Sequence, residues 1–218
     1  MRKEIICFDL DGTLVDSTKA HLLAYQQALQ EEGYKKSTTQ IKNYFGLAGP
    51  VLLQKLLPKV KKNQREHIQK RQQELLLITF YKKVKPTKGV RSVLKILKKN
   101  FLLAVASNSQ KKEILYFLEK TKINKNLFDV IVSREEVKHA KPSPEMILKV
   151  QSKLQGSVKF MVGDTMYDIQ AGKKAKCKTI AFLAGTQSKK KLQTAKPDVI
   201  IKSLKEILAL IKPIYSKE

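Results

Sequence analysis

The chain has 218 residues, a formal charge of +25 and 42% apolar residues. This length and apolar content exclude an intrinsically disordered chain and allow one sizeable core, with or without a small inserted domain. Because no apolar run approaches the roughly 20 residues of a membrane-spanning helix, and the N-terminal residues lack the pattern of a secretory signal, we expect a cytoplasmic protein without a membrane anchor.

The first third of the chain predicts one strand and then only helices. Residues 4–8 are a short apolar run typical of a buried strand. Apolar positions then recur at helical spacing, with Ser17 as a candidate N-cap and Gly33 as a helix end. The expected helices are one that starts after Ser17, one capped by Thr38 or Thr39 that runs to residue 44, and two at 51–57 and 63–81, with a loop over 45–50.

Beyond Pro86, apolar strands alternate with helices. We expect strands at 101–106, 128–132, 158–162, 179–182 and 198–201, and helices at 90–99, 111–120, 144–154, 167–175 and 204–211. This alternation predicts a Rossmann-like, doubly wound α/β fold, in which helices cover both faces of a parallel sheet. We therefore divide the chain into an α/β core of residues 1–15 and 86–218 and an inserted helical domain of residues 16–85.

Four polar clusters follow predicted strands, where ligands bind in open parallel sheets. Asp9 and Asp11 follow the first strand, and residues 107–109 follow the second. Residues 163–168 follow the fourth strand, and Lys141 comes a short connection after the third. Each cluster alone is weak evidence, because such residues are common in turns and helix caps. Their shared position at one edge of the sheet predicts a site that combines carboxylates, a hydroxyl and an ammonium group.

In this order, the clusters resemble a known family. Residues 8–17 are Phe-Asp-Leu-Asp-Gly-Thr-Leu-Val-Asp-Ser, and Ser107, Lys141 and the pair Gly163-Asp164 with Asp168 follow. The chain is similar to the haloacid dehalogenase superfamily, in the branch of phosphoglycolate phosphatases and β-phosphoglucomutases that carry a helical cap between the first two motifs. The resemblance spans nearly the whole chain and implies that the inserted helices are such a cap.

The resemblance and the residue types together imply phosphoryl transfer. Asp9 is expected to be the nucleophile and to form an aspartyl-phosphate, and Asp11 to act as acid for the leaving alcohol and then as base for water. The side chains of Asp9 and Asp164, with the backbone carbonyl of Asp11, are expected to hold Mg²⁺, a hard cation that prefers oxygen ligands. Asp168 is expected to reach the metal through a water molecule or, alternatively, only to cap the following helix.

Two further clusters are expected to bind the phosphate. The Ser107 hydroxyl would donate to a phosphate oxygen, with Asn108 beside it, although a serine at this position can also be an ordinary helix cap. Lys141 would neutralise the nucleophile and the transferred phosphoryl group as a point charge.

An acid at position 11 separates the members of this superfamily, since the resemblance implies that phosphatases and phosphomutases keep it and dehalogenases lack it. We therefore predict a Mg²⁺-dependent, phosphoglycolate phosphatase-like enzyme that acts on a small phosphorylated metabolite. A pyrophosphatase and a β-phosphoglucomutase-like enzyme are alternatives. His21 weakly favours the mutase, whereas Gly49 stands where such mutases carry a phosphate-binding arginine.

We expect the cap residues Gly46, Leu47 and Gly49 to contribute to substrate specificity. The sequence leaves both a monomer and a homodimer open.

The charge of +25 suggests an alternative of a different class, a nucleic-acid-binding protein on a vestigial fold. Residues 16–88 carry 15 basic and 5 acidic side chains, and the rest of the chain carries 29 and 14, so no single segment holds the excess. Of the basic residues 39 are Lys and only 5 are Arg, although Arg is expected for bidentate contacts with phosphate or guanine. This distribution favours a solvated surface, and we expect no specific nucleic-acid partner.

Overall fold

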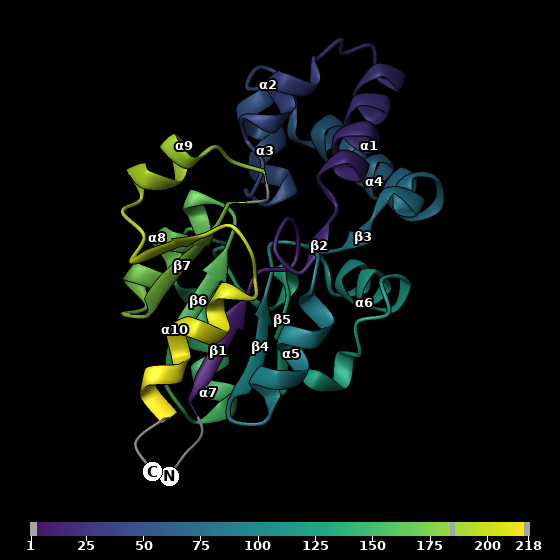
Figure 1. Ribbon diagram of the computed structural model, residues 1–218. Coiled ribbons are helices and arrows are strands. Elements are labelled where there is room, and N and C mark those ends of the chain that lie inside the picture. Colours follow the sequence, from purple (N-terminus) through teal and green to yellow (C-terminus); the bar gives the residue numbers. More distant parts are fainter. Residues whose placement is uncertain (1–3, 184–185, 216–218) are drawn as a thin grey trace.

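A six-stranded parallel sheet forms the centre of the molecule in the computed structural model, which describes residues 4–183 and 186–215 (Figure 1). Its strands are β1 (Ile5–Phe8), β4 (Leu102–Ala106), β5 (Val130–Val132), β6 (Val158–Gly163), β7 (Lys178–Phe182) and β8 (Val199–Ile201). Their order is β5-β4-β1-β6-β7-β8, and every neighbouring pair is parallel. The chain builds one side of β1 and then crosses to build the other, so the carboxyl end of β1 lies at the topological switch point, where such sheets bind ligands.

Helices cover both faces of this sheet, and alternate residues of β1 explain why. Ile6 and Phe8 pack into one apolar cluster, and Ile5 and Cys7 pack into another on the opposite face, as the two-residue period of a strand requires. The covering helices are α5 (Val90–Lys98), α6 (Lys111–Lys120), α7 (Glu145–Leu154), α8 (Met166–Lys174), α9 (Lys189–Thr194) and α10 (Glu206–Tyr215). Helices α5, α6 and α10 pack on the first cluster and α7 packs on the second.

The helical insertion begins directly after β1 and lies above the carboxyl ends of the strands (Figure 1). It comprises α1 (Thr18–Glu31), α2 (Thr38–Lys42), α3 (Gly49–Leu56), α4 (Lys62–Leu75), a π-helical turn η1 (Leu76–Phe80) and a 3₁₀ turn η2 (Tyr81–Lys83). Two short antiparallel strands, β2 (Val15–Asp16) and β3 (Lys85–Pro86), join it to the core. Because both connections run through this ribbon, the insertion is anchored at one narrow place. In the described part of the chain, no helix has both the length and the apolar character to cross a bilayer.

The predicted elements differ from the structure mainly in the insertion. The long helix predicted over 63–81 ends at Leu75 and continues as η1 and η2. Ser37, not a threonine, caps α2, because its Oγ accepts from the backbone N–H of Gln40 at 3.2 Å. Helix α3 begins at Gly49, so the loop predicted over 45–50 ends two residues early. The remaining short elements, η3 (Lys125–Leu127), η4 (Arg134–Glu136), α9, β2 and β3, are too short to show a hydrophobic period.

Candidate active site

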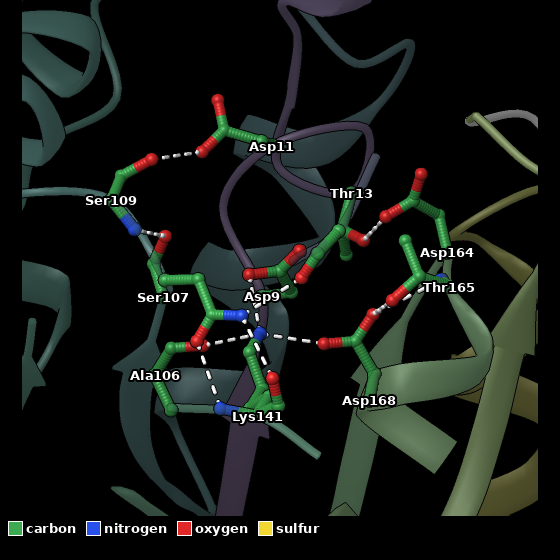
Figure 2. Close-up of polar contacts among 12 residues, drawn as sticks. Asp9, Asp11, Thr13, Ala106, Ser107, Ser109, Lys141, Asp164, Thr165 and Asp168 are labelled. Atoms are coloured by element: carbon green, nitrogen blue, oxygen red, sulfur yellow. Dashed lines mark hydrogen bonds and ion pairs between the residues drawn. The ribbon is translucent and has the colours of Figure 1, made fainter. Parts of the chain in front are cut away.

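Three adjacent strands of the sheet, β4, β1 and β6, end at the same edge and present polar residues there. Asp9 follows β1, Ser107 follows β4, and Asp164 follows β6. The backbone N–H of Asp9 still bonds the carbonyl of Val162 at 2.9 Å, so the sheet ladder itself fixes the start of the first cluster. Lys141 comes from the connection between β5 and α7 and reaches into the same space (Figure 2).

The ammonium group of Lys141 joins the clusters. Its Nζ donates to Asp9 Oδ1 at 2.7 Å, to Asp168 Oδ1 at 2.5 Å and to the carbonyl of Ala106 at 2.8 Å. The side chain is only 2% exposed. Burial alone would lower the pKa of Lys141, but the two carboxylates outweigh it and raise the pKa above its usual range. The lysine is therefore a fixed positive charge with all three of its hydrogen-bond donors engaged.

Three buried carboxylates surround this lysine. Oxygens of Asp9, Asp164 and Asp168 lie within 4.8 Å of one another. Burial raises the pKa of Asp9 well above its ordinary value, with Lys141 opposing the shift, and burial followed by the charge of Asp168 raises the pKa of Asp164 to about 7. Three carboxylates beside one ammonium group leave a buried excess of negative charge, and their all-oxygen donor set fits a hard divalent cation such as Mg²⁺.

The turn after β1 and the segment before α9 hold Asp164. Thr13 Oγ1 donates to Asp164 Oδ1 at 3.3 Å, and the backbone N–H of Thr186 donates to Oδ2 at 2.8 Å. Gly12 has a φ of +75°, and a Cβ at this position would lie 2.1 Å from Asp164 Oδ2. Both the backbone conformation and the lack of space therefore require glycine beside this carboxylate.

Asp168 has two functions at once. Its Oδ1 accepts from Lys141, and its Oδ2 accepts from the backbone N–H and the hydroxyl of Thr165 at 3.0 and 2.6 Å, which completes a capping box at the start of α8. Asp168 therefore caps the helix with Oδ2, as the helix-cap alternative predicted, and binds Lys141 with Oδ1. Because both oxygens already accept hydrogen bonds, contact with a metal through water is the arrangement that leaves these bonds intact.

The carboxylate of Asp11 points away from Asp9 and toward Ser109 (Figure 2). Its Oδ1 accepts from Ser17 Oγ at 2.6 Å and lies 3.1 Å from His21 Nε2, and its Oδ2 accepts from Ser109 Oγ at 2.8 Å. Burial works to raise the pKa of Asp11, but His21 and the two hydroxyls lower it below the ordinary value. Ser17 stands at the N-cap of α1 without capping it by a side-chain bond, because its hydroxyl serves Asp11 instead.

His21 lies between two acidic groups. Its Nε2 is also 3.5 Å from Glu113 Oε1. Burial would lower the pKa of His21, but the hydrogen bond and charge of Asp11, together with Glu113, raise it to about 9. The ring is therefore protonated at neutral pH and donates to Asp11. Burial raises the pKa of Glu113 to about 7.

Ser107 and Asn108 differ in what they offer to a ligand. Ser107 is buried, and its Oγ accepts from the backbone N–H of Ser109 at 3.1 Å, which leaves the hydroxyl hydrogen to be donated. Asn108 Oδ1 accepts from the backbone N–H of Lys141 at 2.9 Å, and its Nδ2 donates to the carbonyls of Lys141 and Gly46 at 3.2 and 2.8 Å. Asn108 thus positions the Lys141 backbone and ties it to the insertion, and phosphate binding by its side chain stays a prediction.

A cavity of about 160 Å³ separates this edge of the sheet from the insertion. Asp9, Asp11, Ser107 and Lys141 line one side, and Gly46, Leu47 and Gly49 line the other. The insertion is held down around the cavity by Asn108, by Gln187 Nε2, which donates to the Phe45 carbonyl at 3.3 Å, and by Lys191 Nζ, which donates to the Asn43 carbonyl at 3.0 Å. These bonds close the helical insertion over the polar residues of the core.

Sequence reasoning missed several groups that complete the site. Ser109, just before α6, bonds Asp11, and Glu113, on α6, faces His21. From the insertion, the cavity is also lined by Tyr25, Gln69 and Gln72. Ser109 belongs to the predicted cluster of residues 107–109, but its sequence position assigned it no role. The others lie on amphipathic helices, where a polar residue on the inner face is not distinguishable in sequence from one on the outer face.

Comparisons with known proteins agree with this geometry. The family model described as haloacid dehalogenase-like hydrolase matches residues 6–182. The chain belongs to the haloacid dehalogenase-like hydrolase family. A phosphoglycolate phosphatase of Aquifex aeolicus is 34% identical over 215 residues, which cover 95% of this hydrolase and 96% of the relative. A pyrophosphatase PpaX of Oceanobacillus iheyensis is 27% identical over 215 residues, which cover 94% and 95%.

A solved structure shows the same fold. The crystal structure of a hydrolase from Pseudomonas syringae superposes with a TM-score of 0.88 at 23% identity and covers 98% of this hydrolase and 100% of that chain. The predicted fold class is therefore confirmed: a parallel α/β sheet interrupted after its first strand by helices.

Proposed function

We propose that this protein is a Mg²⁺-dependent phosphatase that hydrolyses a small phosphate monoester through an aspartyl-phosphate on Asp9. The observation that carries the proposal is the buried ion-pair cluster in which Lys141 joins Asp9 to Asp168, beside Asp164 and open to the cavity through Ser107. The names of the full-length relatives, phosphoglycolate phosphatase and pyrophosphatase, support phosphate-ester or phosphoanhydride chemistry.

In the first step, a carboxylate oxygen of Asp9 attacks phosphorus, and the bond between phosphorus and the leaving oxygen breaks. Lys141 holds Asp9 in place by a 2.7 Å bond and offsets negative charge on the phosphoryl group. The hydroxyl of Ser107 donates to a phosphoryl oxygen. Because the site is closed by the helical insertion, water has little access to the nucleophile during this step.

Asp11 supplies and removes the protons. Its protonated form gives a proton to the leaving oxygen, and its ionised form then takes a proton from the water that attacks the aspartyl-phosphate, which releases phosphate and restores Asp9. The structure shows Asp11 with three hydrogen-bond donors around it and a lowered pKa. This arrangement suits the second half of the reaction, in which Asp11 is the base.

The carboxylates of Asp9 and Asp164 and the backbone carbonyl of Asp11 would hold Mg²⁺, with Asp168 contacting it through water. When bound, the metal supplies positive charge that neutralises the phosphate oxygens and lowers the barrier to attack by an anionic nucleophile. The excess of buried carboxylate around a single lysine supports this assignment.

One structural observation bears on the mutase alternative. A Cβ at Gly49 would lie 2.0 Å from Gln69 Oε1. Because Gln69 fills the space beside position 49, an arginine could enter there only if Gln69 moved. Glycine at position 49 offers no cationic side chain for a second phosphate, and the amide of Gln69 occupies the adjacent space, which favours hydrolysis over return of the phosphoryl group.

The experiment is to compare wild type with Asp9→Asn on p-nitrophenyl phosphate and a panel of small organic phosphates, in MgCl₂ and in EDTA. We expect the variant to lose about 10⁴-fold or more in kcat, because it removes the nucleophile, and we expect wild type to be inactive in EDTA. Asp16→Asn is the matched control, since Asp16 lies in the same segment but is exposed. Turnover by Asp9→Asn at the wild-type rate would overturn the mechanism.

A further inference from the structure

A chain of hydrogen bonds crosses the side of the cavity that the insertion provides. The hydroxyl of Tyr25 on α1 donates to Gln69 Oε1 at 3.0 Å, and Gln69 Nε2 on α4 donates to Gln72 Oε1 at 3.0 Å. Burial, followed by the charge of Glu113, raises the pKa of Tyr25, so the phenol keeps its proton and acts as the donor at the start of the chain. Each amide is thereby oriented by the group before it.

The chain ends on an unpaired donor. Gln72 is 1% exposed and lines the cavity, and its Nε2 has no hydrogen-bond partner among the described residues. An amide N–H₂ that is shielded from solvent without a partner costs about 1–3 kcal/mol, so native structures rarely keep one without a reason. The Tyr25–Gln69 relay fixes the carbonyl of Gln72 and leaves the amide nitrogen as the open end of the chain, on a residue that lines the cavity.

The cationic groups of this cavity already have hydrogen-bond partners within the protein. Among the described residues that line it, the cationic groups are Lys141, His21 and Arg134. Lys141 bonds two carboxylates, and His21 lies between Asp11 and Glu113. Arg134 donates to the carbonyls of Val137 and Lys138 at 2.7 and 3.3 Å.

A carboxylate or second phosphate on the leaving group would therefore face the carboxyl groups of Asp11 and Glu113, and it would have to compete with two backbone carbonyls for the guanidinium of Arg134. Three cationic residues of the insertion, Lys62, Arg65 and Lys70, line a second cavity of about 450 Å³, which shares Gln69 and Gln73 with the first. Of these, Arg65 donates to the carbonyls of Leu57 and Val60, and Lys62 pairs with Glu66 at 3.8 Å.

Building on the proposed phosphatase function, we infer that Gln72 is a specificity-determining residue whose side-chain amide donates a hydrogen bond to an uncharged oxygen, a hydroxyl or carbonyl, on the leaving group. The substrate class is thus a phosphate monoester of a small neutral hydroxylated compound, in preference to phosphoglycolate or pyrophosphate. Tyr25 and Gln69 are positioning residues, because they act only through the orientation of Gln72.

The test measures kcat/KM for four substrates in MgCl₂: glycerol 3-phosphate, n-propyl phosphate, phosphoglycolate and pyrophosphate. Glycerol 3-phosphate and n-propyl phosphate have the same carbon chain and differ in the hydroxyl groups. In Gln72→Met, we expect kcat/KM for glycerol 3-phosphate, divided by kcat/KM for n-propyl phosphate, to fall about 5- to 20-fold. This is the size of effect that loss of one hydrogen bond to a neutral group predicts. Activity on n-propyl phosphate should fall less than activity on glycerol 3-phosphate, because n-propyl phosphate offers no partner to the amide.

Tyr25→Phe serves as the second variant, since it keeps the ring and removes only the donor that orients Gln69. A smaller fall of about 2- to 5-fold in the same ratio is expected. Gln64→Met is the matched control, because Gln64 lies on α4 but does not line the cavity and bonds Glu32 instead. Thermal unfolding of each variant verifies that it is folded.

The outcomes separate the inference from the function on which it rests. If wild type hydrolyses these esters but prefers phosphoglycolate or pyrophosphate, or if Gln72→Met leaves the ratio unchanged, the role of Gln72 is overturned and the phosphatase function stands. If wild type hydrolyses none of the panel and p-nitrophenyl phosphate is also untouched, the proposed function fails, and the inference fails with it.

Discussion

The two sides of the cavity are built from different chemistry. We call the core side the floor, which consists of Asp9, Ser107, Lys141, Asp164 and Asp168, and the insertion side the roof, which consists of Tyr25, Phe45, Gln69 and Gln72. The floor is charged: Lys141 donates to Asp9 and Asp168, and oxygens of Asp9, Asp164 and Asp168 lie within 4.8 Å of one another. The roof is uncharged and joins its polar groups by a single chain of hydrogen bonds.

This difference separates reaction from selection. A phosphoryl group carries the same charge in every substrate, so the floor needs fixed charges in a water-excluded place, where electrostatic interactions are strongest. Leaving groups differ in shape and in hydrogen-bonding groups, so the roof needs oriented neutral donors. Of the 44 basic side chains, only Lys141 belongs to either side, since His21 lies between Asp11 and Glu113 and Arg134 donates to carbonyls of its own connection.

Removal of the floor's only lysine should have the largest effect. In Lys141→Met, three buried carboxylates lose their cation, and we expect a loss of about 3–5 kcal/mol in the free energy of unfolding and a fall of about 10³-fold in kcat. Urea denaturation and p-nitrophenyl phosphate hydrolysis measure the two effects. Lys138→Met is the control, because Lys138 is an exposed lysine of the same connection. Near-normal stability of Lys141→Met would show that the floor does not depend on charge balance.

Glu113→Gln tests the place where floor and roof meet. Glu113 is buried and faces His21, Asp11, Tyr25 and Glu135, and its pKa is raised from 4.5 to about 7 mainly by burial. Since the folded state favours the protonated carboxyl group, this group's contribution to stability is present below about pH 4.5 and is lost as the pH rises through about 7. The glutamine variant should therefore gain stability relative to wild type as the pH rises, by an upper limit of about 3 kcal/mol.

The measurement for Glu113→Gln is thermal unfolding of both proteins at pH 5 and at pH 8. The difference in melting temperature between variant and wild type should be more favourable to the variant at pH 8 than at pH 5. A constant difference across this range would mean that Glu113 stays ionised throughout, held by His21. That result would place a second fixed charge pair at the rim of the roof.

The smallest effect is expected at the outer contact between the two sides. Lys191→Met removes the bond from its ammonium group to the carbonyl of Asn43, and we expect a loss of about 0.5–1 kcal/mol in stability. Because Asn108 and Gln187 still hold the insertion, kcat/KM should change by no more than about 3-fold. The exposed Lys190→Met is the matched control. A larger loss of activity would show that this one bond governs closure of the roof.

Much of the core could be predicted from its sequence because its strands are short apolar runs between polar turns. The helix predicted at 111–120 coincides with α6, and each of the six strands lies within two residues of its predicted range. The ribbon of β2 and β3 was not predicted, since a two-residue strand has no period. The division at residues 15 and 86 stays a prediction, although the ribbon residues Val15 and Pro86 pair at that point.

In the site, sequence position placed the floor residues, and the structure brings Asp9, Ser107, Lys141 and Asp164 to one edge as that position implies. Their assigned roles in catalysis and metal binding stay predictions. Asn108 lies at the predicted edge, but its amide bonds the backbone of Lys141 and Gly46. A residue that follows a strand reaches the right edge of the sheet, but its partners there come from segments far away in the chain.

The sequence by itself determined the parallel sheet, the helical insertion and the set of chemical groups at the strand ends, because hydrophobic periods and strand-end positions are local properties of the chain. Only the tertiary structure decided which groups pair: Lys141 with Asp9 and Asp168, and Asp11 with His21. It also decided that the amide nitrogen of Gln72 has no partner among the described residues. The physical reason is that hydrogen bonds and ion pairs are determined by distances of a few ångströms between residues that are far apart in sequence. Those distances exist only after the insertion has closed on the core.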